Sequence, residues 1–306
     1  MIGSAMRIVF FGTPDFASAS LEAIVASGQN VVCVVTAPDK PAGRGQKLSE
    51  SSVKKTAVAL KIPILQPANL KAPEFIDALS AYQADIGVVI AFRMLPEVVW
   101  NMPKLGTINL HGSLLPNYRG AAPIHHAIIN GEKITGVSTF FLKHEIDTGD
   151  LISSEEISIG EDETVGELHD RMMAVGAGLM VDTLQQIAKG EYSSHPQPTL
   201  EHLKSAPKLN RAFCELTLDL RVNDFHNKVR GLSPYPGAWI QSAYGDLKVL
   251  RGQLILHGAT QPASGVEIMQ KRLLVHLVDG DYEILELQAA GKPRMMSKDF
   301  INGVKI

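Results

Sequence analysis

The chain has 306 residues, of which 45% are hydrophobic and 20% are charged, a balance typical of globular proteins. This composition excludes a disordered or fibrous chain, and no apolar run approaches the roughly 20 residues that cross a bilayer, which argues against a membrane protein. The net charge of −3 is uneven, with 16 basic and 22 acidic residues in 1–207 but 13 and 10 in 208–306. Total charge therefore does not predict nucleic-acid binding, although local basic clusters can still contact phosphate.

Two features of the sequence indicate a reducing compartment. Cys33 and Cys214 lie far apart and in no metal-ligand spacing, so we expect neither a disulfide framework nor a zinc site. The N-terminal segment MIGSAMRIVFFG lacks the basic region and the long apolar region of a secretory signal. The sequence also contains none of the common metal-binding motifs. We therefore expect a cytoplasmic protein without a metal centre.

The first half of the chain alternates short apolar strands with amphipathic helices. Strands are predicted at 7–12, 31–37, 62–65, 86–91 and 107–110, and helices near 15–27 and 71–82. Strands that are apolar throughout and separated by helices indicate a parallel sheet covered on both faces. We therefore predict an α/β fold with a doubly wound, mostly parallel, Rossmann-like sheet.

The pattern changes after a long helix. A T-x-x-E capping box at Thr164–Glu167 predicts the start of this helix, which ends at Gly190. Residues 192–207 carry three prolines, a composition typical of a linker. A helix near 223–231 and strand-like runs then follow, at 238–243, 247–256, 272–278 and 282–287. These short strands predict a small β-barrel, and hence an α/β domain at 1–190, a linker at 191–207 and a barrel domain at 208–306.

The turn after the first strand, Gly12-Thr13-Pro14-Asp15, does not have the G-x-G-x-x-G spacing of a dinucleotide site. We interpret it as a tight turn in which Thr13 caps a helix and Pro14 occupies its first position. No nicotinamide cofactor is predicted.

The pattern most indicative of chemistry is Asn109-Leu110-His111, at the end of an apolar strand. Residues i and i+2 of a strand face the same side, so Asn109 and His111 should point together. Open α/β sheets bind ligands at such strand ends. The alternative is an ordinary edge asparagine and a histidine with a structural hydrogen bond.

A second polar cluster covers residues 144–150 and contains Asp147. Asn, His and Asp together suit acyl transfer to an amine, since an amide can donate to an oxyanion while His and Asp manage the amine proton. The alternative is that Asp147 only shapes the turn before Gly149.

The third feature is the loop that follows the second strand. Five basic residues stand against the single acidic Glu50 between positions 40 and 55: Lys40, Arg44, Lys47, Lys54 and Lys55. Glycines on both sides of Arg44 allow a close backbone approach while the guanidinium reaches a phosphate or a base edge. The alternative is a solvated loop without a ligand.

Taken together, the sequence resembles the methionyl-tRNA formyltransferases over nearly its whole length. The segments that carry this resemblance are GTPDFA (12–17), PDKPAGRGQKL (38–48), NLHGSLLPNYRGAAPI (109–124), DTGD (147–150), SPYPGAW (233–239) and LQAAGKPRM (287–295). One departure is the stretch AFRMLP at 91–96, where many members have an A-Y-G-type sequence. That stretch is expected to form a wall of the pterin pocket.

The resemblance implies a role for several residues. Asn109, His111 and Asp147 match the catalytic residues, Ser113, Leu114, Leu115 and Pro116 match the folate-contacting segment, and Arg44 matches the loop arginine that engages the tRNA acceptor end. Residues 1–190 would be the catalytic domain, and residues 208–306 an OB-like barrel that helps to hold tRNA.

The function implied is transfer of a formyl group from 10-formyltetrahydrofolate to the α-amino group of initiator methionyl-tRNA, for translation initiation. We expect no metal, no membrane association and a monomer. One rival is a formyltransferase or hydrolase that acts on a sugar nucleotide, glycinamide ribonucleotide or water, which the PAGRG loop disfavours. The other is a catalytically silent RNA-binding module, which the Asn-His-Asp set disfavours.

Overall fold

The computed structural model describes residues 5–42, 47–256 and 265–304. The chain forms two compact units. The first comprises Met1–Arg119, Gly136–Ile157 and Asp170–Lys204, and the second comprises Gly120–Thr135, Ser158–His169 and Ser205–Ile306. Across the described ranges, no helix combines the length and the apolar character needed to span a membrane.

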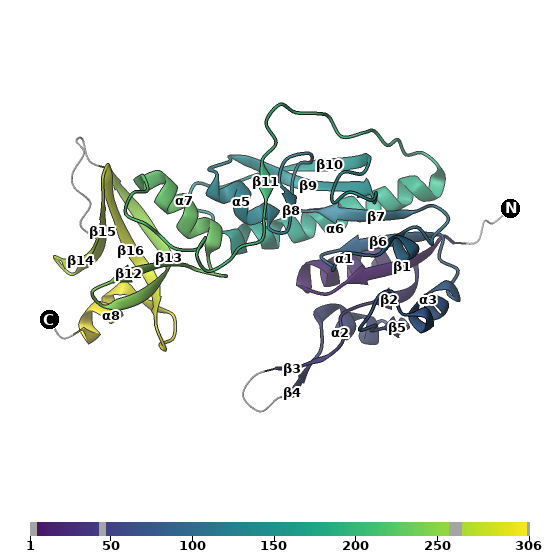
Figure 1. The fold of residues 1–306 in the computed structure, drawn as a ribbon, viewed down its shortest axis with the longest axis horizontal. Helices are drawn as coiled ribbons and strands as arrows, with labels where there is room; N and C mark the ends of the chain where they lie inside the picture. Colours follow the sequence, from purple (N-terminus) through teal and green to yellow (C-terminus); the bar gives the residue numbers. More distant parts are fainter. Residues whose placement is uncertain (1–4, 43–46, 257–264, 305–306) are drawn as a thin grey trace. The chain divides into compact units, whose positions relative to one another are not determined.

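The first unit is built on a seven-stranded sheet with the order β10-β9-β7-β6-β1-β2-β5 (Figure 1). Its strands are β1 (Arg7–Gly12), β2 (Asn30–Val35), β5 (Ile64–Leu65), β6 (Ile86–Ile90), β7 (Thr107–His111), β9 (Ile134–Phe141) and β10 (Leu151–Ser158). β1 pairs in parallel with β2 and β6, and β6 does so with β7, whereas β7 and β9 are antiparallel. The predicted mostly parallel sheet is confirmed.

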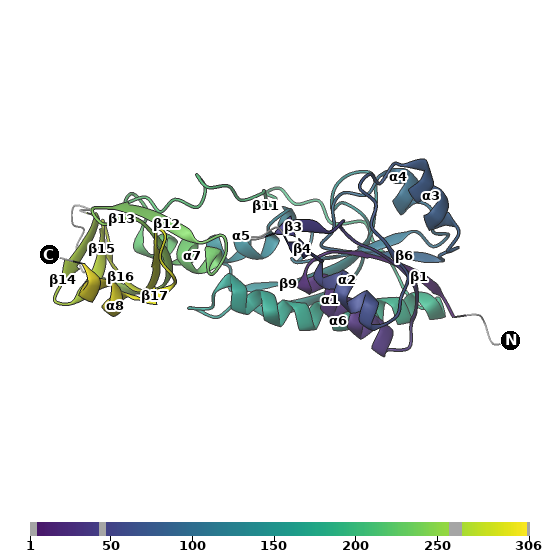
Figure 2. The ribbon, with the colours of Figure 1, turned by 90° about the horizontal axis from the view of Figure 1, so that it is seen from below.

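Helices cover both faces of this sheet (Figure 2). They are α1 (Asp15–Ala26), α2 (Ser52–Ala59), α3 (Pro73–Ser80), α4 (Glu97–Trp100) and α6 (Val165–Lys189). On one face, Val9 and Phe11 of β1 belong to a buried cluster with Phe75 of α3 and Val99 of α4. On the other, α6 approaches β7 so closely that a Cβ on Gly176 would stand 2.9 Å from Leu110 Cδ2. Alternate residues of the strands therefore bury against different helices.

Two predicted helix starts have different outcomes. The Thr164–Glu167 capping box is confirmed, since Glu167 N donates to Thr164 Oγ1 at 3.3 Å and Thr164 N donates to Glu167 Oε2 at 2.9 Å. The cap predicted at Thr13 is wrong by one residue. Pro14 is the N-cap of α1 without a side-chain cap bond, and its carbonyl accepts from Ala17 N and Ser18 N at 3.1 Å. These are the ordinary first backbone bonds of the helix, and a proline N-cap has no side-chain oxygen that could accept a further one.

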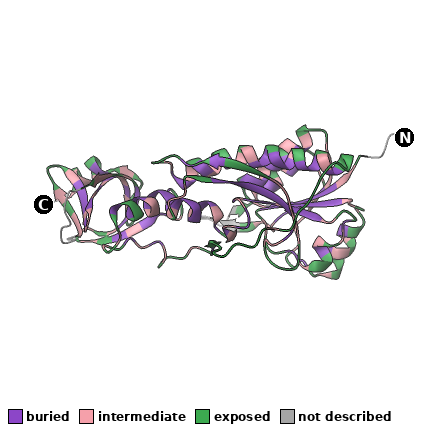
Figure 3. Ribbon diagram, turned by 90° about the horizontal axis from the view of Figure 1, so that it is seen from above, coloured by how far each residue is buried: buried purple, intermediate pink, exposed green. Residues whose placement is uncertain are grey.

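The second unit contains an antiparallel sheet with the order β12-β13-β16-β15-β14, and β17 pairs with β16. Its elements are α5 (Pro123–Ile129), α7 (Val222–Leu232), β12 (Ala238–Ser242), β13 (Gly245–Leu256), β14 (Gly265–Met269), β15 (Arg272–Leu277), β16 (Gly280–Ala289), β17 (Met295–Met296) and α8 (Ser297–Gly303). Figure 1 shows this sheet curled into a half-open barrel, which confirms the predicted small barrel. Phe225 of α7 packs on Tyr282 of β16 with ring centroids 4.9 Å apart, and both side chains are fully buried. Figure 3 shows buried residues along the strands of both units.

Four short strands complete the fold. β3 (Lys40–Ala42) and β4 (Lys47–Ser49) form an antiparallel pair at the base of the predicted basic loop. The two-residue strands β8 (Arg119–Gly120) and β11 (Ser205–Ala206) also pair.

Candidate active site

The candidate site begins where β7 ends. Asn109 lies opposite Val89 of β6 and Phe140 of β9, and His111 lies opposite Ser138 of β9. Both residues are therefore in the middle of the sheet, at the carboxyl end of a strand. His111 is buried and Asn109 is half-buried. As residues i and i+2 of one strand, they face the same side.

The hydrogen bonds of His111 determine which ring nitrogen can take up a proton. His111 Nε2 lies 2.8 Å from the carbonyl oxygen of Tyr118. A carbonyl oxygen only accepts, so Nε2 must carry a hydrogen and donate it. In the neutral ring Nδ1 is then the unprotonated nitrogen. It lies 3.8 Å from Asp147 Oδ2, and the two side chains are only 8% and 14% exposed.

Asp147 is part of the loop between β9 and β10. Its φ of +54° lies in the left-handed region, which Asp and Asn adopt more readily than most residues. Two residues later, a Cβ on Gly149 would lie 1.5 Å from the carbonyl oxygen of Phe141. This loop therefore packs directly on the end of β9, and only glycine fits at that contact.

The segment predicted to contact folate follows His111 directly. Ser138 connects β9 to this segment, because its hydroxyl donates to Ser113 O at 2.8 Å and accepts from Leu115 N at 3.2 Å. The Ser113 hydroxyl donates to Asn117 O at 2.7 Å. Ser113, Leu115 and Pro116 are buried, whereas Leu114 is half-buried. The backbone of 113–116 is thus held against the sheet beside His111.

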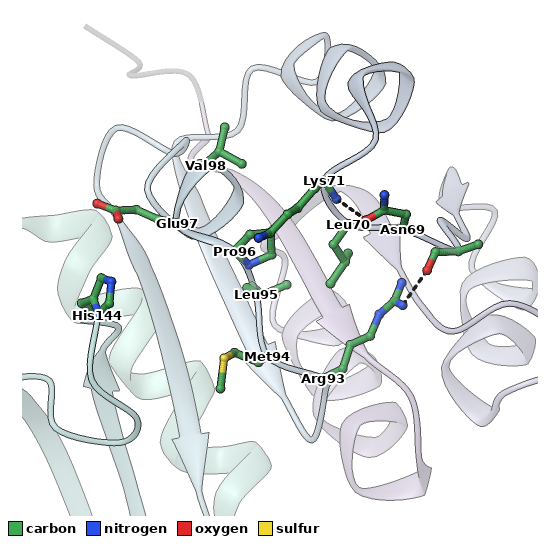
Figure 4. Close-up of a pocket in the computed structure, with 11 residues that line it drawn as sticks. Asn69, Leu70, Lys71, Arg93, Met94, Leu95, Pro96, Glu97, Val98 and His144 are labelled. Atoms are coloured by element: carbon green, nitrogen blue, oxygen red, sulfur yellow. Dashed lines mark hydrogen bonds between the residues drawn. The ribbon is translucent and has the colours of Figure 1, made fainter.

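A cavity of about 860 Å³ opens in the same unit (Figure 4). Its lining comes from three segments: Ala68, Asn69, Leu70 and Lys71; Arg93, Met94, Leu95, Pro96, Glu97 and Val98; and His144. The second segment follows β6, the neighbour of β7, and His144 lies in the loop that carries Asp147. An apolar lining with a few polar and charged groups is typical of small-molecule sites.

Arg93 links two walls of this cavity. Its guanidinium donates to Ala68 O at 2.9 Å and also to Pro67 O, and it lies over the Phe92 ring at 5.7 Å. Phe92 in turn packs on Phe11 of β1, with centroids 6.0 Å apart. The stretch that departs from the resemblance therefore forms a cavity wall here, with Arg93 as its connection to residues 67–71.

Comparisons with known proteins identify the family of the chain. Residues 6–184 match the family described as formyl transferase, and residues 208–305 match the formyl transferase C-terminal domain. A methionyl-tRNA formyltransferase of Flavobacterium psychrophilum is 45% identical over 98% of this chain and 96% of its own length. One from Bacteroides fragilis is 45% identical over 97% and 95%. The chain belongs to the methionyl-tRNA formyltransferase family.

Membership in this family confirms the predicted enzyme class, a formyltransferase. A solved structure described as WlaRD, a sugar 3N-formyl transferase in the presence of dTDP and 5-N-formyl-THF, has a TM-score of 0.67. It is 18% identical and the match covers 95% of this chain and all of that one. At this identity the likeness concerns the fold, which the two proteins share.

The structure brings most of the predicted site residues of this formyltransferase together. His111 and Asp147 face each other, Asn109 lies two residues from His111, and segment 113–116 follows it. Arg44 lies outside the described residues. Sequence reasoning missed Arg93 as a contact between two cavity walls, and it missed Gln197, which contacts the Asp147 loop. The only sequence signal for Arg93 was its place in the atypical stretch 91–96, and Gln197 had none.

Proposed function

We propose that this formyltransferase transfers a formyl group from 10-formyltetrahydrofolate to the α-amino group of methionine esterified to initiator tRNA. We propose further that it does so in the cytoplasm, as a monomer, to supply translation initiation. The observation that carries the proposal is the group formed by Asn109, His111 and Asp147 beside segment 113–116, with His111 Nδ1 3.8 Å from Asp147 Oδ2.

We propose that the folate donor occupies the cavity that His144, from the loop carrying Asp147, helps to line. Leu70, Leu95 and Val98 supply apolar contact area for a flat pterin and aminobenzoyl system. Lys71 and Arg93 outnumber the one acidic lining residue, Glu97, which favours a ligand that carries carboxylates. We propose that Ser113, Leu114, Leu115 and Pro116 contact the donor near its formyl end, because they lie next to His111 in the chain.

The reaction forms one bond to the formyl carbon and breaks another. The neutral amine of methionine attacks this carbon, the bond from carbon to N10 of the folate breaks, the amine loses a proton and N10 gains one. Charge develops on the formyl oxygen during the attack. We propose that the Asn109 amide donates a hydrogen bond to that oxygen, which is the interaction of an oxyanion hole.

His111 and Asp147 handle the amine proton in this scheme. Because Tyr118 O fixes a hydrogen on Nε2, Nδ1 is the nitrogen that can accept a proton. Asp147 stabilises the resulting imidazolium from 3.8 Å, and the pair then delivers a proton to N10. A Tyr118 carbonyl on one nitrogen and a carboxylate on the other orient the ring for this transfer.

For the second substrate we propose contacts from both units. Arg44 would engage the acceptor end of the tRNA, and residues 208–306, with 13 basic against 10 acidic residues, would contact its phosphates. Sequence relatives at 45% identity carry the name of a tRNA-dependent enzyme, which favours this substrate over sugar nucleotides or glycinamide ribonucleotide.

The test is a formyl-transfer assay with 10-formyltetrahydrofolate and a panel of acceptors. We expect formyl-methionyl-tRNA with charged initiator tRNA, and no product with uncharged tRNA, a dTDP-amino sugar or glycinamide ribonucleotide. Formylation of a small acceptor at a comparable kcat/KM, or release of formate to water alone, would replace the proposal with one of its rivals.

A further inference from the structure

One residue of the predicted linker differs from its neighbours. Of the ten residues 191–200, Gln197 alone is half-buried, and the other nine are exposed. The segment is also fixed to β10 nearby, because Leu151 N donates to His195 O at 2.8 Å and His195 N donates to Leu151 O at 2.9 Å. Gln197 is therefore held close to the loop that precedes β10.

The side-chain amide of Gln197 uses all of its hydrogen-bonding groups. Its Nε2 donates to the carbonyl oxygens of Asp147 at 2.8 Å and Gly149 at 2.9 Å. Its Oε1 accepts from Nε of Arg119 at 3.1 Å and from an Nη of the same guanidinium at 2.5 Å. All three residues that it contacts lie in the same compact unit as Gln197.

These partners leave one orientation for the amide. A guanidinium only donates and a carbonyl only accepts, so Oε1 must face Arg119 and Nε2 must face the two carbonyls. A flipped amide would place its oxygen against two carbonyl oxygens. Arg119 therefore orients Gln197, and Gln197 in turn presents two donors to the loop.

The two carbonyls flank Thr148 and belong to the turn that aims Asp147. The φ of Asp147 is +54°, a conformation that persists where surrounding contacts hold it. The Asp147 carboxylate stands 3.8 Å from His111 Nδ1, so a small movement of the turn would separate the pair. Gln197 thus contacts the backbone of Asp147, the residue whose carboxylate must stay close to His111.

We propose that Gln197, oriented by Arg119, is a positioning residue that holds the Asp147 carboxylate against His111 Nδ1 during formyl transfer. This inference rests on the proposed catalytic role of Asp147. A misplacement of about 1 Å in a reacting group can cost roughly a hundredfold in rate. Loss of two hydrogen bonds that hold the turn should therefore slow the chemical step while the substrates still bind.

Two substitutions separate positioning from packing. Gln197→Ala removes all four bonds. Gln197→Glu keeps the shape and gains an ion pair with Arg119, but it presents oxygen instead of N–H to the carbonyls of Asp147 and Gly149. For both variants we expect the single-turnover rate of formyl transfer to fall roughly tenfold or more, with KM for donor and tRNA within about twofold of wild type. If Gln197 only packed the segment, Gln197→Glu would react normally.

The matched control is Gln185→Ala, which truncates an exposed glutamine on α6 in the same unit. We expect wild-type rate and KM for this variant. Thermal unfolding of all three proteins shows whether a loss of rate reflects loss of fold, and Gln197→Glu keeps the test valid if Gln197→Ala fails to fold.

The deciding measurement is a double-mutant cycle with Asp147→Asn. If Gln197 acts through Asp147, the second substitution should add less than about twofold to the loss already caused by Asp147→Asn. The inference would be overturned if the rate losses of the two single variants multiplied in the double variant. An unchanged rate in the single Gln197 variants, or an effect confined to KM, would also overturn it. A normal rate for Asp147→Asn alone would instead remove the proposed role of Asp147, so the two failures are distinguishable.

Discussion

At the level of single residues, Asp147 allows the sharpest test of the site. Its φ of +54° is compatible with Asn, so Asp147→Asn keeps the turn and removes only charge and basicity. We expect kcat to fall by roughly a hundredfold or more, within the range usual for general acid–base groups. KM for donor and tRNA should change little, since neither substrate is bound through the proton-transfer pair.

The alternative interpretation makes the opposite prediction for the same protein. If Asp147 served only the turn before Gly149, Asn would be tolerated because it is an equally good turn former. A folded Asp147→Asn enzyme with near-normal kcat would therefore disprove the catalytic role. Stopped-flow binding of the folate donor is the control, and it should be unchanged.

The alternation of side chains along a strand was enough to predict that Asn109 and His111 face the same side, because both lie on one strand. The partners of His111 could not be predicted in the same way. Tyr118 contributes a backbone carbonyl, and carbonyls are common to all residues, so no side-chain pattern marks this contact. Gln197 is 50 positions from Asp147, and only the folded backbone brings the two together.

At the level of elements, the wall formed by residues 91–96 depends on one arginine. Arg93 donates to Ala68 O and Pro67 O and so connects the two longer segments that line the cavity. We expect Arg93→Ala to raise KM for the folate donor roughly tenfold, about 1.4 kcal/mol of binding, with kcat little changed. Arg93→Lys should restore only part of the affinity, because Lys lacks the planar fork that reaches both carbonyls.

The matched control for this prediction is Arg7→Ala. Arg7 also donates twice to a carbonyl in the first unit, with Nε and an Nη at 3.1 and 2.9 Å from Tyr82 O. It lies at the start of β1, away from the carboxyl ends of the parallel strands. We expect this variant to lose thermal stability while KM stays normal. If KM for the folate donor rose equally in Arg7→Ala and Arg93→Ala, the rise would be a general result of losing an arginine–carbonyl contact. The specific role of Arg93 in the cavity wall would then be disproved.

Helix α7 contains a buried histidine whose surroundings lead us to expect a pH-dependent stability of the second unit. His226 of α7 contacts Glu161 O at 3.3 Å, Asp162 Oδ1 at 3.2 Å and the Tyr282 hydroxyl at 3.4 Å. Burial lowers the pKa of His226, an effect that outweighs the opposing contributions of the Glu161 carbonyl and Asp162, and Arg230 lowers it further. The unfolded chain therefore binds a proton more readily than the folded chain does.

The sign of the pH effect follows from this difference. The stability due to neutral His226 is present above the unfolded pKa of about 6.5 and is lost as pH falls below it. We expect the Tm to decrease from pH 7 to pH 5, and to decrease less in His226→Gln. His125, whose pKa burial also lowers, adds an effect of the same sign, so part of the slope should remain. A Tm that rises towards pH 5 would contradict this account.

Strong periodicity decided which elements were predictable. The apolar strand β1 and the helices α1 and α6 were predicted to within a few residues, since each carries a continuous or 3.6-residue pattern. β10 was missed because most of its residues are partly or fully exposed and present no apolar face. Residues 191–207 were predicted as a linker from their prolines. Of these, residues 191–204 belong to the first unit, where His195 pairs with Leu151.

At the level of the whole molecule, the two compact units do not follow the chain in a simple order. Segments 120–135 and 158–169 belong to the second unit, although they lie within the predicted catalytic domain. The formyl transferase families match 6–184 and 208–305. The boundary between the two matched families thus lies near the predicted linker. The compact units divide the chain differently, since residues 120–135 and 158–169 belong to the unit that contains the barrel.

The distribution of charge leads to the last prediction. Residues 208–306 carry a small basic excess within an acidic protein, and many of their arginines are paired, for example Arg221 with Asp279 and Arg272 with Glu283. Pairing with carboxylates reduces the positive charge that these arginines offer to phosphate. If two to three phosphates are neutralised, counterion release predicts that KM for charged tRNA rises roughly tenfold to fortyfold between 50 and 200 mM salt. KM for the folate donor should rise far less, since that ligand has no condensed counterions. A tRNA KM that is independent of salt would mean that phosphate contacts contribute little and that the enzyme recognises its tRNA through bases or the aminoacyl group.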